Sequence, residues 1–389
     1  FGQAEIDELA ELEATTRHDV KAVEYLVRRK LSDLGLTGIS ELTHFACTSE
    51  DINNLSYALT ISAAVREVWL PKFRSLIAAL RERAIELRDD AMLAHTHGQP
   101  ATPTTMGKEL AVFVYRLDRI LTQIEATEYL GKFSGATGTF AAHLAADATQ
   151  DWPAISNEFV TSLGLTWNPL TTQIESHDWQ AELYSRISHA NRVLHNLCTD
   201  VWTYISMGYF RQIPQPGATG SSTMPHKINP IRFENAEANL ELSSALLDSL
   251  AATLVTSRLQ RDLTDSTTQR NIGVALGHSL LALDNIERGL KEIDLNRDAL
   301  AADLDGNWEI LGEAIQTVIR AEVTAGRSSI ADPYAILKEL TRGKRVGQAE
   351  LVEFIDGLDI GADAKARLRE LTPATYAGLA SELVEYLAG

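Results

Sequence analysis

The stretch EDINNLSYALTISAAVREVWLPKFRSLIAALRERAIELR, residues 50–88, decides the fold class of this chain. Its apolar residues recur at three- and four-residue spacing, which is the period of a helix that buries one face. Pro71 lies inside the run and predicts a kink or an interruption, because proline lacks the N–H that a helix interior needs. Similar periodic segments cover about 104–130, 175–210, 231–258 and 267–294, all long for globular helices. The sequence therefore predicts an all-α protein built on five long helices.

Turn-rich segments separate these runs, at residues 92–103, 131–153, 164–173 and 211–230. We expect the functional side chains there, because loops held by rigid helices present residues in fixed positions. Beyond about residue 292 the helical patterns shorten and the charge density rises. We predict three parts: residues 1–37 as the remainder of a truncated N-terminal helical domain, residues 38–291 as a central long-helix bundle with candidate catalytic loops, and residues 292–389 as a C-terminal helical domain. Because the chain starts at Phe1 inside a helical pattern, we expect a further segment before it.

The composition excludes several classes of protein. A formal net charge of −18 over 389 residues repels nucleic-acid backbones, although a local basic cluster is enough to bind a small anion. No apolar run reaches about 18 residues, so we expect no membrane span. The two cysteines, Cys47 and Cys198, and the lack of a signal-peptide pattern indicate a reducing, cytoplasmic location. Metal-ligand spacings are missing as well, so we expect neither a metal nor a cofactor.

The segment GSSTMPHKINP, residues 220–230, concentrates catalytic side-chain types in one loop. Two hydroxyls precede a proline-bracketed His-Lys-x-Asn, and a helical pattern follows. A flexible backbone, a candidate base, a cation and a helix N-terminus thus lie within a few residues of each other. The alternative is an ordinary surface loop that happens to contain Ser221 and Lys227.

A second block, residues 43–54, places Thr48 and Ser49 directly before a helical pattern. Hydroxyls at this position either cap the helix or, together with free backbone amides, bind an anion. Both interpretations remain open for this block.

A third block contains His95 and His97, followed by a glycine and two prolines that predict a stiff, non-helical segment. The unperturbed pKa of histidine, about 6.5, suits proton transfer near neutral pH. For either histidine alone, a structural role is the alternative.

The fourth block, residues 258–270, places Arg261 and Arg270 on either side of a hydroxyl-rich turn. Two guanidinium groups at such a turn form a seat for phosphate or carboxylate, whereas a turn with two surface arginines is the alternative. The RHD motif at residues 17–19 adds a further cation and imidazole, and Gln173 adds a neutral amide that suits substrate orientation.

Taken together, these blocks resemble the fumarase/aspartase superfamily, whose signature is similar to the pattern at residues 220–230. Within it, the chain is most similar to the adenylosuccinate lyase family of the longer bacterial type. The motifs that carry this likeness are RHD (17–19), HFACTSED (44–51), THGQPA (96–101), TQIE (172–175), MPHK (224–227), FEN (233–235) and QRDLTDS (260–266). Two differences from the family are that its Arg-Tyr pair for the nucleotide phosphate would precede Phe1, and that His95 replaces a common arginine.

The resemblance implies a three-domain lyase whose five-helix bundle assembles into a twenty-helix tetramer core, with each active site shared by three subunits. The implied reaction is elimination of fumarate from adenylosuccinate, giving AMP, and from succinyl-aminoimidazole carboxamide ribotide in purine biosynthesis. It requires a small nucleotide substrate and involves no nucleic acid, membrane, metal or cofactor. The rival readings are a sister lyase acting on argininosuccinate, fumarate or aspartate, and a non-catalytic helical assembly protein.

By the same resemblance, Ser221 is the general base and His97 the general acid that protonates the departing nitrogen. Lys227 and the amides of the following helix would support the serine alkoxide. Gly217 and Gly220 suggest that the serine loop is a lid that closes on bound substrate. The expected substrate-binding residues are Arg17, His18, Asp19, His44, Thr48, Ser49, Gln173, Lys227, Asn229, Asn235, Arg261, Ser266, Thr267, Thr268, Gln269 and Arg270.

Overall fold

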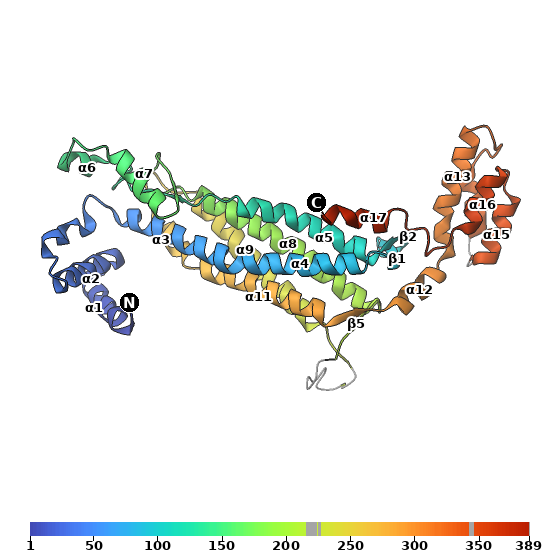
Figure 1. Cartoon of the computed structure of the whole chain (residues 1–389), viewed down its shortest axis with the longest axis horizontal. Helices are drawn as coiled ribbons and strands as arrows, with labels where there is room; N and C mark the ends of the chain where they lie inside the picture. Colours follow the sequence, from blue (N-terminus) through green and yellow to red (C-terminus); the bar gives the residue numbers. More distant parts are fainter. Residues whose placement is uncertain (215–223, 225–226, 342–345, 389) are drawn as a thin grey trace. The chain divides into compact units, whose positions relative to one another are not determined.

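The computed structural model describes residues 1–214, 224, 227–341 and 346–388 (Figure 1). The chain forms two compact units, each made of three stretches of sequence. The first comprises Phe1–Pro71, Thr122–His189 and Leu242–Gly277, and the second comprises Lys72–Leu121, Ala190–Glu241 and His278–Gly389. Among the described residues, none of the helices combines the length and the hydrophobicity of a membrane-spanning segment.

The five long helical runs are present and somewhat shorter than the sequence pattern suggests. The first is α3 (Ser49–Ala63), continued by the π-helical η2 (Ala64–Trp69) and α4 (Leu70–Glu86), and the others are α5 (Met106–Glu125), α8 (Asp178–Ser206), α9 (Ile231–Leu254) and α11 (Ile272–Lys291). The π-helical turn ends just before Pro71, with the Leu70 amide donating to the Val65 carbonyl, so the predicted interruption is confirmed. All-α architecture is confirmed as well, since the strands are few and short.

The first unit contains the N-terminal helices and the short elements of the middle of the chain. Figure 1 shows α1 (Gln3–Thr16) and α2 (Asp19–Asp33) side by side, followed by η1 (Thr37–His44). β3 (Leu130–Gly131) pairs in parallel with β4 (Thr166–Trp167). Between these two strands in the sequence come α6 (Ala141–Ala146) and α7 (Trp152–Ser162). The short α10 (Thr264–Gln269) completes the unit, whose buried residues include Leu55, Leu183 and Leu250.

The turn-rich segment at 92–103 belongs to a β-hairpin in the second unit, where the sequence predicts a stiff, non-helical segment without strands. β1 (Ala91–Thr96) pairs antiparallel with β2 (Gln99–Thr105), and His97 and Gly98 form its turn at positive φ angles of 54° and 73°. Two prolines within β2 hid the strand from the sequence pattern, because proline is normally depleted in strands. A second antiparallel pair joins β5 (Phe210–Gln212) to β6 (Ile293–Leu295).

The C-terminal helices of the second unit have their own apolar core. They are α12 (Arg297–Asp305), η3 (Trp308–Leu311), α13 (Gly312–Thr324), α14 (Pro333–Thr341), α15 (Gln348–Gly357) and α16 (Ala362–Glu370), followed by α17 (Ala380–Leu383) and η4 (Val384–Ala388). Figure 1 shows α13, α15 and α16 side by side, where Ile315, Ile319, Leu351, Ile355 and Leu368 form a buried cluster. This cluster agrees with the predicted compact C-terminal domain. The boundary of that domain at residue 292 stays a prediction.

Candidate active site

A cavity of about 550 Å³ in the first unit gathers ten of the predicted binding residues. Its size lies within the range typical of small-molecule sites. The predicted residues in its wall are Arg17, His18, Asp19, Thr48, Ser49, Gln173, Arg261, Ser266, Thr267 and Arg270, and the wall also contains Glu13, Glu50, Asn53 and Leu263. Segments separated by more than two hundred residues of sequence therefore meet at one polar cavity.

The N-terminus of α3 contributes Thr48 and Ser49 in two different ways. The Asp51 amide donates to the Thr48 backbone carbonyl at 3.0 Å, while the Asp51 carboxylate accepts the Thr48 amide at 2.9 Å. These two bonds fix the start of α3 without the Thr48 hydroxyl, which lies in the cavity wall, so both interpretations of this hydroxyl stay open. Ser49 follows it in the cavity wall, with its hydroxyl 3.5 Å from Nε2 of His18.

His18 is the N-cap of α2, and its hydrogen bonds define the tautomer of the neutral ring. Its Nδ1 accepts the Lys21 amide at 3.3 Å, which leaves Nε2 to carry the proton. That N–H is directed at the cavity, where Ser49 lies. His18 thus suits hydrogen bonding to a ligand oxygen.

The arginines of the cavity differ in their partners. Arg261 forms an ion pair with Glu50 at 2.5 Å, and the Glu50 side chain is only 5% exposed. Arg17 and Arg270 are exposed, and neither forms an ion pair with the described residues. Because the charge of Arg261 is balanced by Glu50, Arg17 and Arg270 are the cations best able to receive an anionic ligand.

Buried hydrogen bonds hold the helix α10 in place, and no sequence motif predicts them. Asp265 accepts the Ser266 amide at 2.7 Å and lies 3.3 Å from Nε2 of His177. Burial raises the pKa of Asp265, but the hydrogen bonds from His177 and Ser266 outweigh it, so its pKa lies below the usual value. His177 is 1% exposed at a positive φ of 61°, and no local pattern marks such a residue.

Three predicted binding residues of the first unit lie outside the cavity wall. Gln269 is buried and accepts a hydrogen bond from Gln180 at 3.4 Å, and the Thr268 hydroxyl donates to the Thr264 carbonyl at 2.7 Å. His44 lines a separate, largely apolar hollow with residues such as Val27 and Leu42. These side chains lie outside the polar cavity, and their roles in substrate binding stay predictions.

The remaining predicted residues belong to the second unit or lie outside the described residues. His97 is exposed at the tip of the β1–β2 hairpin. Lys227 is exposed and Asn229 half-buried, while the Asn235 side-chain oxygen accepts hydrogen bonds from Asn239 and Asn285 at 3.1 and 3.0 Å. Ser221 lies outside the described residues, as do Gly217 and Gly220.

The hairpin geometry at His97 is unusual for a residue with a side chain. A positive φ costs a non-glycine residue energy, and such strain tends to persist at functional positions. Both His97 and the following Gly98 adopt a positive φ, and the His97 side chain is exposed at the hairpin tip. A two-residue hairpin turn requires a positive φ at both positions, so the fold accounts for this geometry and the catalytic role of His97 stays a prediction.

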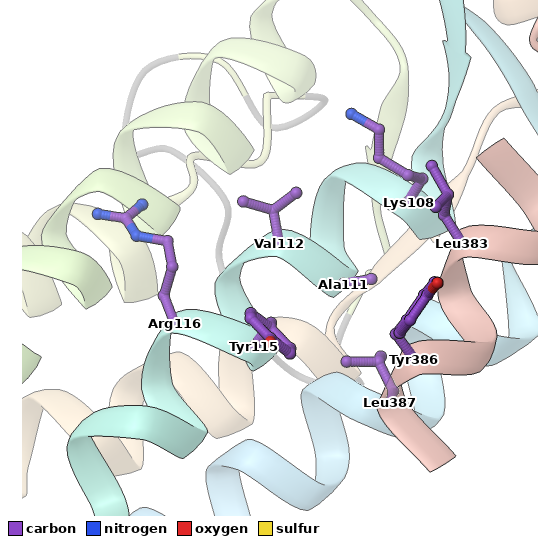
Figure 2. A pocket seen from close by; sticks show the side chains of 8 residues that line it. All are labelled: Lys108, Ala111, Val112, Tyr115, Arg116, Leu383, Tyr386 and Leu387. Carbon is purple, nitrogen blue, oxygen red and sulfur yellow. The ribbon is translucent and has the colours of Figure 1, made fainter. Parts of the chain in front are cut away.

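The second unit has a different cavity, of about 400 Å³. Figure 2 shows Lys108, Val112 and Tyr115 on α5 facing Leu383, Tyr386 and Leu387 of the C-terminal segment. It contains none of the predicted site residues, so the polar cavity of the first unit is the stronger candidate.

Neither metal binding nor cysteine chemistry is suggested by the described residues. No group of three or more His, Cys, Asp or Glu among them is arranged to hold a metal ion. Burial, with a contribution from Asp51, raises the pKa of Cys47 to about 12, so this thiol stays protonated.

Two family models match the chain. The model described as "Lyase" matches residues 2–241, and the model described as "Adenylosuccinate lyase C-terminal" matches residues 257–377.

Proteins of similar sequence are described as adenylosuccinate lyases. The chain is 50% identical to the adenylosuccinate lyase of Escherichia coli (strain K12) over 388 residues, which covers 100% of this chain and 84% of that protein. The adenylosuccinate lyase of Vibrio cholerae serotype O1 is also 50% identical, with the same coverage of each chain. That of Haemophilus influenzae is 49% identical over 389 residues.

Among solved structures, fumarate lyase from Mesorhizobium sp. BNC1 matches with a TM-score of 0.76 and 19% identity, covering 100% of this chain and 86% of that one. The 3-carboxy-cis,cis-muconate lactonizing enzyme from Pseudomonas putida matches with a TM-score of 0.74 and 21% identity, covering 99% and 84% of the two chains. At these identities the likeness shows a shared fold.

Proposed function

The chain belongs to the adenylosuccinate lyase family, and we propose that it eliminates fumarate from adenylosuccinate, and from succinyl-aminoimidazole carboxamide ribotide, with the polar cavity of the first unit as its binding site. As a family member it is a fumarate-releasing lyase that acts on a C–N bond. The observation that carries the assignment of the site is the convergence of ten expected binding residues on one cavity.

The chemistry explains why these residue types are needed. A proton leaves the carbon beside a carboxylate, which gathers negative charge, while the departing amine must gain a proton. A general base, a general acid and oriented cations or hydrogen-bond donors are therefore the minimum requirement. In our proposal Arg17 and Arg270 bind the anionic parts of the substrate, helped by the hydroxyls of Ser49, Ser266 and Thr267.

Gln173, His18 and Arg261 would orient the substrate, and Thr48 and Asp19 complete the wall. We propose His97 as the acid on the leaving nitrogen and Ser221 as the base that removes the proton from carbon. Lys227, Asn229 and Asn235 would bind the succinyl carboxylates. The exposed position of His97 at the hairpin tip supports this role, because its imidazole is accessible to a substrate.

The proposed assembly is a homotetramer in which three subunits contribute to each site. Large apolar side chains exposed on the long helices support it, including Tyr115 on α5, Leu242 on α9 and Leu281 on α11. Exposed apolar surface of this kind is typical of protein–protein interfaces. The proposed compartment is the cytoplasm, and the two unpaired cysteines agree with a reducing environment.

A substrate panel tests the function. Purified protein is incubated with adenylosuccinate, and separately with argininosuccinate, fumarate and aspartate, while fumarate absorbance is followed and the products are identified. Formation of AMP and fumarate from adenylosuccinate alone is the expected result. Turnover of another substrate in its place would support a sister lyase, and no turnover of any would support a non-catalytic assembly protein.

A further inference from the structure

Lys132, directly after β3, is a fully buried lysine that the proposed reaction does not use. Its ammonium group lies 2.9 Å from Oδ1 of Asp51, and both side chains are 0% exposed. It also donates to the Gly135 carbonyl at 3.0 Å. Burying an ion pair costs desolvation energy, whereas apolar packing does not have this cost. The Lys132–Asp51 pair therefore points to a role in fixing the neighbouring backbone.

The Asp51 carboxylate joins the start of α3 to the loop after β3. Besides Lys132, it accepts the Thr48 amide at 2.9 Å, the Ser134 amide at 2.9 Å and the Gly135 amide at 3.1 Å. One carboxylate therefore sets both the N-terminus of α3, where Ser49 lines the cavity, and the path of the loop. Without the charge of Lys132, this carboxylate would be buried with amide donors alone.

A second set of bonds reinforces the same junction. The Asn54 side chain accepts the Lys132 amide at 2.8 Å and donates to the Lys132 carbonyl at 2.9 Å. The backbone of Lys132 is thus fixed to α3 on both sides of its side chain.

The far end of this loop contacts the segment that presents Gln173. The Gln173 side-chain amide donates to the Ala136 carbonyl at 3.0 Å. Gly138, at a φ of +74°, approaches so closely that a Cβ there would lie 2.3 Å from the Thr171 carbonyl oxygen. Residues 132–138 therefore connect two parts of the cavity wall, Ser49 and Gln173.

We propose that Lys132 is a positioning residue that, through Asp51 and the 132–138 loop, sets the separation of Ser49 and Gln173 across the binding cavity. The proposal rests on the proposed function, since it assigns both residues to substrate binding. Lys132 is not part of the cavity wall, so it acts only through its neighbours. Its loss displaces two binding groups together, which weakens substrate binding and so raises the KM.

The main experiment measures steady-state kinetics of Lys132→Met with adenylosuccinate, alone and combined with Ser49→Ala or Gln173→Ala. We expect the KM to rise by about tenfold or more, with a smaller change in kcat. The effect should shrink in either combined variant, because the group being positioned is already missing. Normal KM, or full additivity with both alanine variants, would overturn the proposal.

Glu322→Gln is the matched control for loss of a buried charge. Glu322 is 3% exposed in the second unit, where it binds Arg327 at 2.7 Å and the Gly361 amide at 3.1 Å. Its substitution should lower the melting temperature and leave the KM unchanged. An equal rise in KM for Glu322→Gln would mean that any buried-charge loss suffices, and would overturn the specific role of Lys132.

Hydrogen exchange provides a readout that does not depend on activity. Amides of residues 171–175 should exchange faster in Lys132→Met than in the wild type, but not in Glu322→Gln. If the wild type turns over no adenylosuccinate while exchange changes as expected, the proposed function fails and the positional link stands. If Lys132→Met does not fold, Gly138→Ala replaces it: its Cβ would lie 2.3 Å from the Thr171 carbonyl oxygen, so the loop must move away from residues 171–172. Normal KM and exchange in that variant would refute the link.

Discussion

Replacing Arg270 with glutamine tests the electrostatics of the cavity. The cavity wall contains three arginines and three carboxylates, and Arg261 is already paired with Glu50. Removing Arg270 therefore turns a balanced wall into one with net negative charge. The substrate carries a phosphate and two carboxylates, so binding should weaken while the chemical step changes little.

The magnitude follows from the exposure of Arg270. Two unit charges about 4 Å apart interact by about 1 kcal/mol in bulk water and by about 4 kcal/mol at an effective dielectric constant of 20. The interaction energy of an exposed arginine with a substrate anion lies near the lower of these values, at about 1–2 kcal/mol. Its loss corresponds to a rise in KM of about 5- to 30-fold. Because exposed charges are screened by salt, the difference between wild type and variant should shrink at high ionic strength.

The assay is fumarate formation from adenylosuccinate at several salt concentrations. Arg258→Gln is the control, because it removes the same charge from the same segment at a residue outside the cavity wall, with a side chain 81% exposed. The reasoning would be refuted if Arg270→Gln kept the wild-type KM, or if Arg258→Gln raised the KM equally.

Three further outcomes are expected. His97→Asn should lower kcat by about 10²- to 10⁴-fold with little change in melting temperature, since asparagine tolerates the positive φ of 54° at this turn; wild-type kcat would argue against His97 as the acid. Hydrogen bonds from Lys72 and Lys291 lower the pKa of Glu287 from 4.5 to about 2, so its contribution to stability is present above pH 4.5 and is lost as the pH falls toward 2. Lys72→Met should flatten this acid limb in thermal melts between pH 6 and 2.5, and an unchanged slope would contradict the assignment. Light scattering should give the mass of a tetramer, and a clean monomer would rule out the shared site.

The helical framework was accessible from sequence because its signals are local. Apolar spacing identified the long runs, and Pro71 marked the interruption that the π-helical η2 accommodates. The hairpin at 91–105 was not accessible, because Pro100 and Pro103 contradict the usual composition of a strand. Local patterns predict helices well and strands of unusual composition poorly.

The cavity shows the same contrast between local and distant information. Arg17, Ser49 and Arg270 were predicted from the motifs that contain them, and the fold brings them to one wall. The Lys132–Asp51 and His177–Asp265 contacts were missed because each joins residues more than eighty positions apart. The sequence does not show which distant residue a buried lysine or histidine contacts, so neither of these pairs can be predicted from a local pattern.

Mixing two impaired variants is the most direct test of a site built from several subunits. One variant carries His97→Asn, and the other carries Arg17→Gln with Arg270→Gln; they are denatured together, refolded and assayed with adenylosuccinate. If neighbouring chains complete each site, the mixture should form fumarate faster than either variant refolded alone. Activity that never exceeds that of the parents, in mixed oligomers verified by mass, would contradict the account.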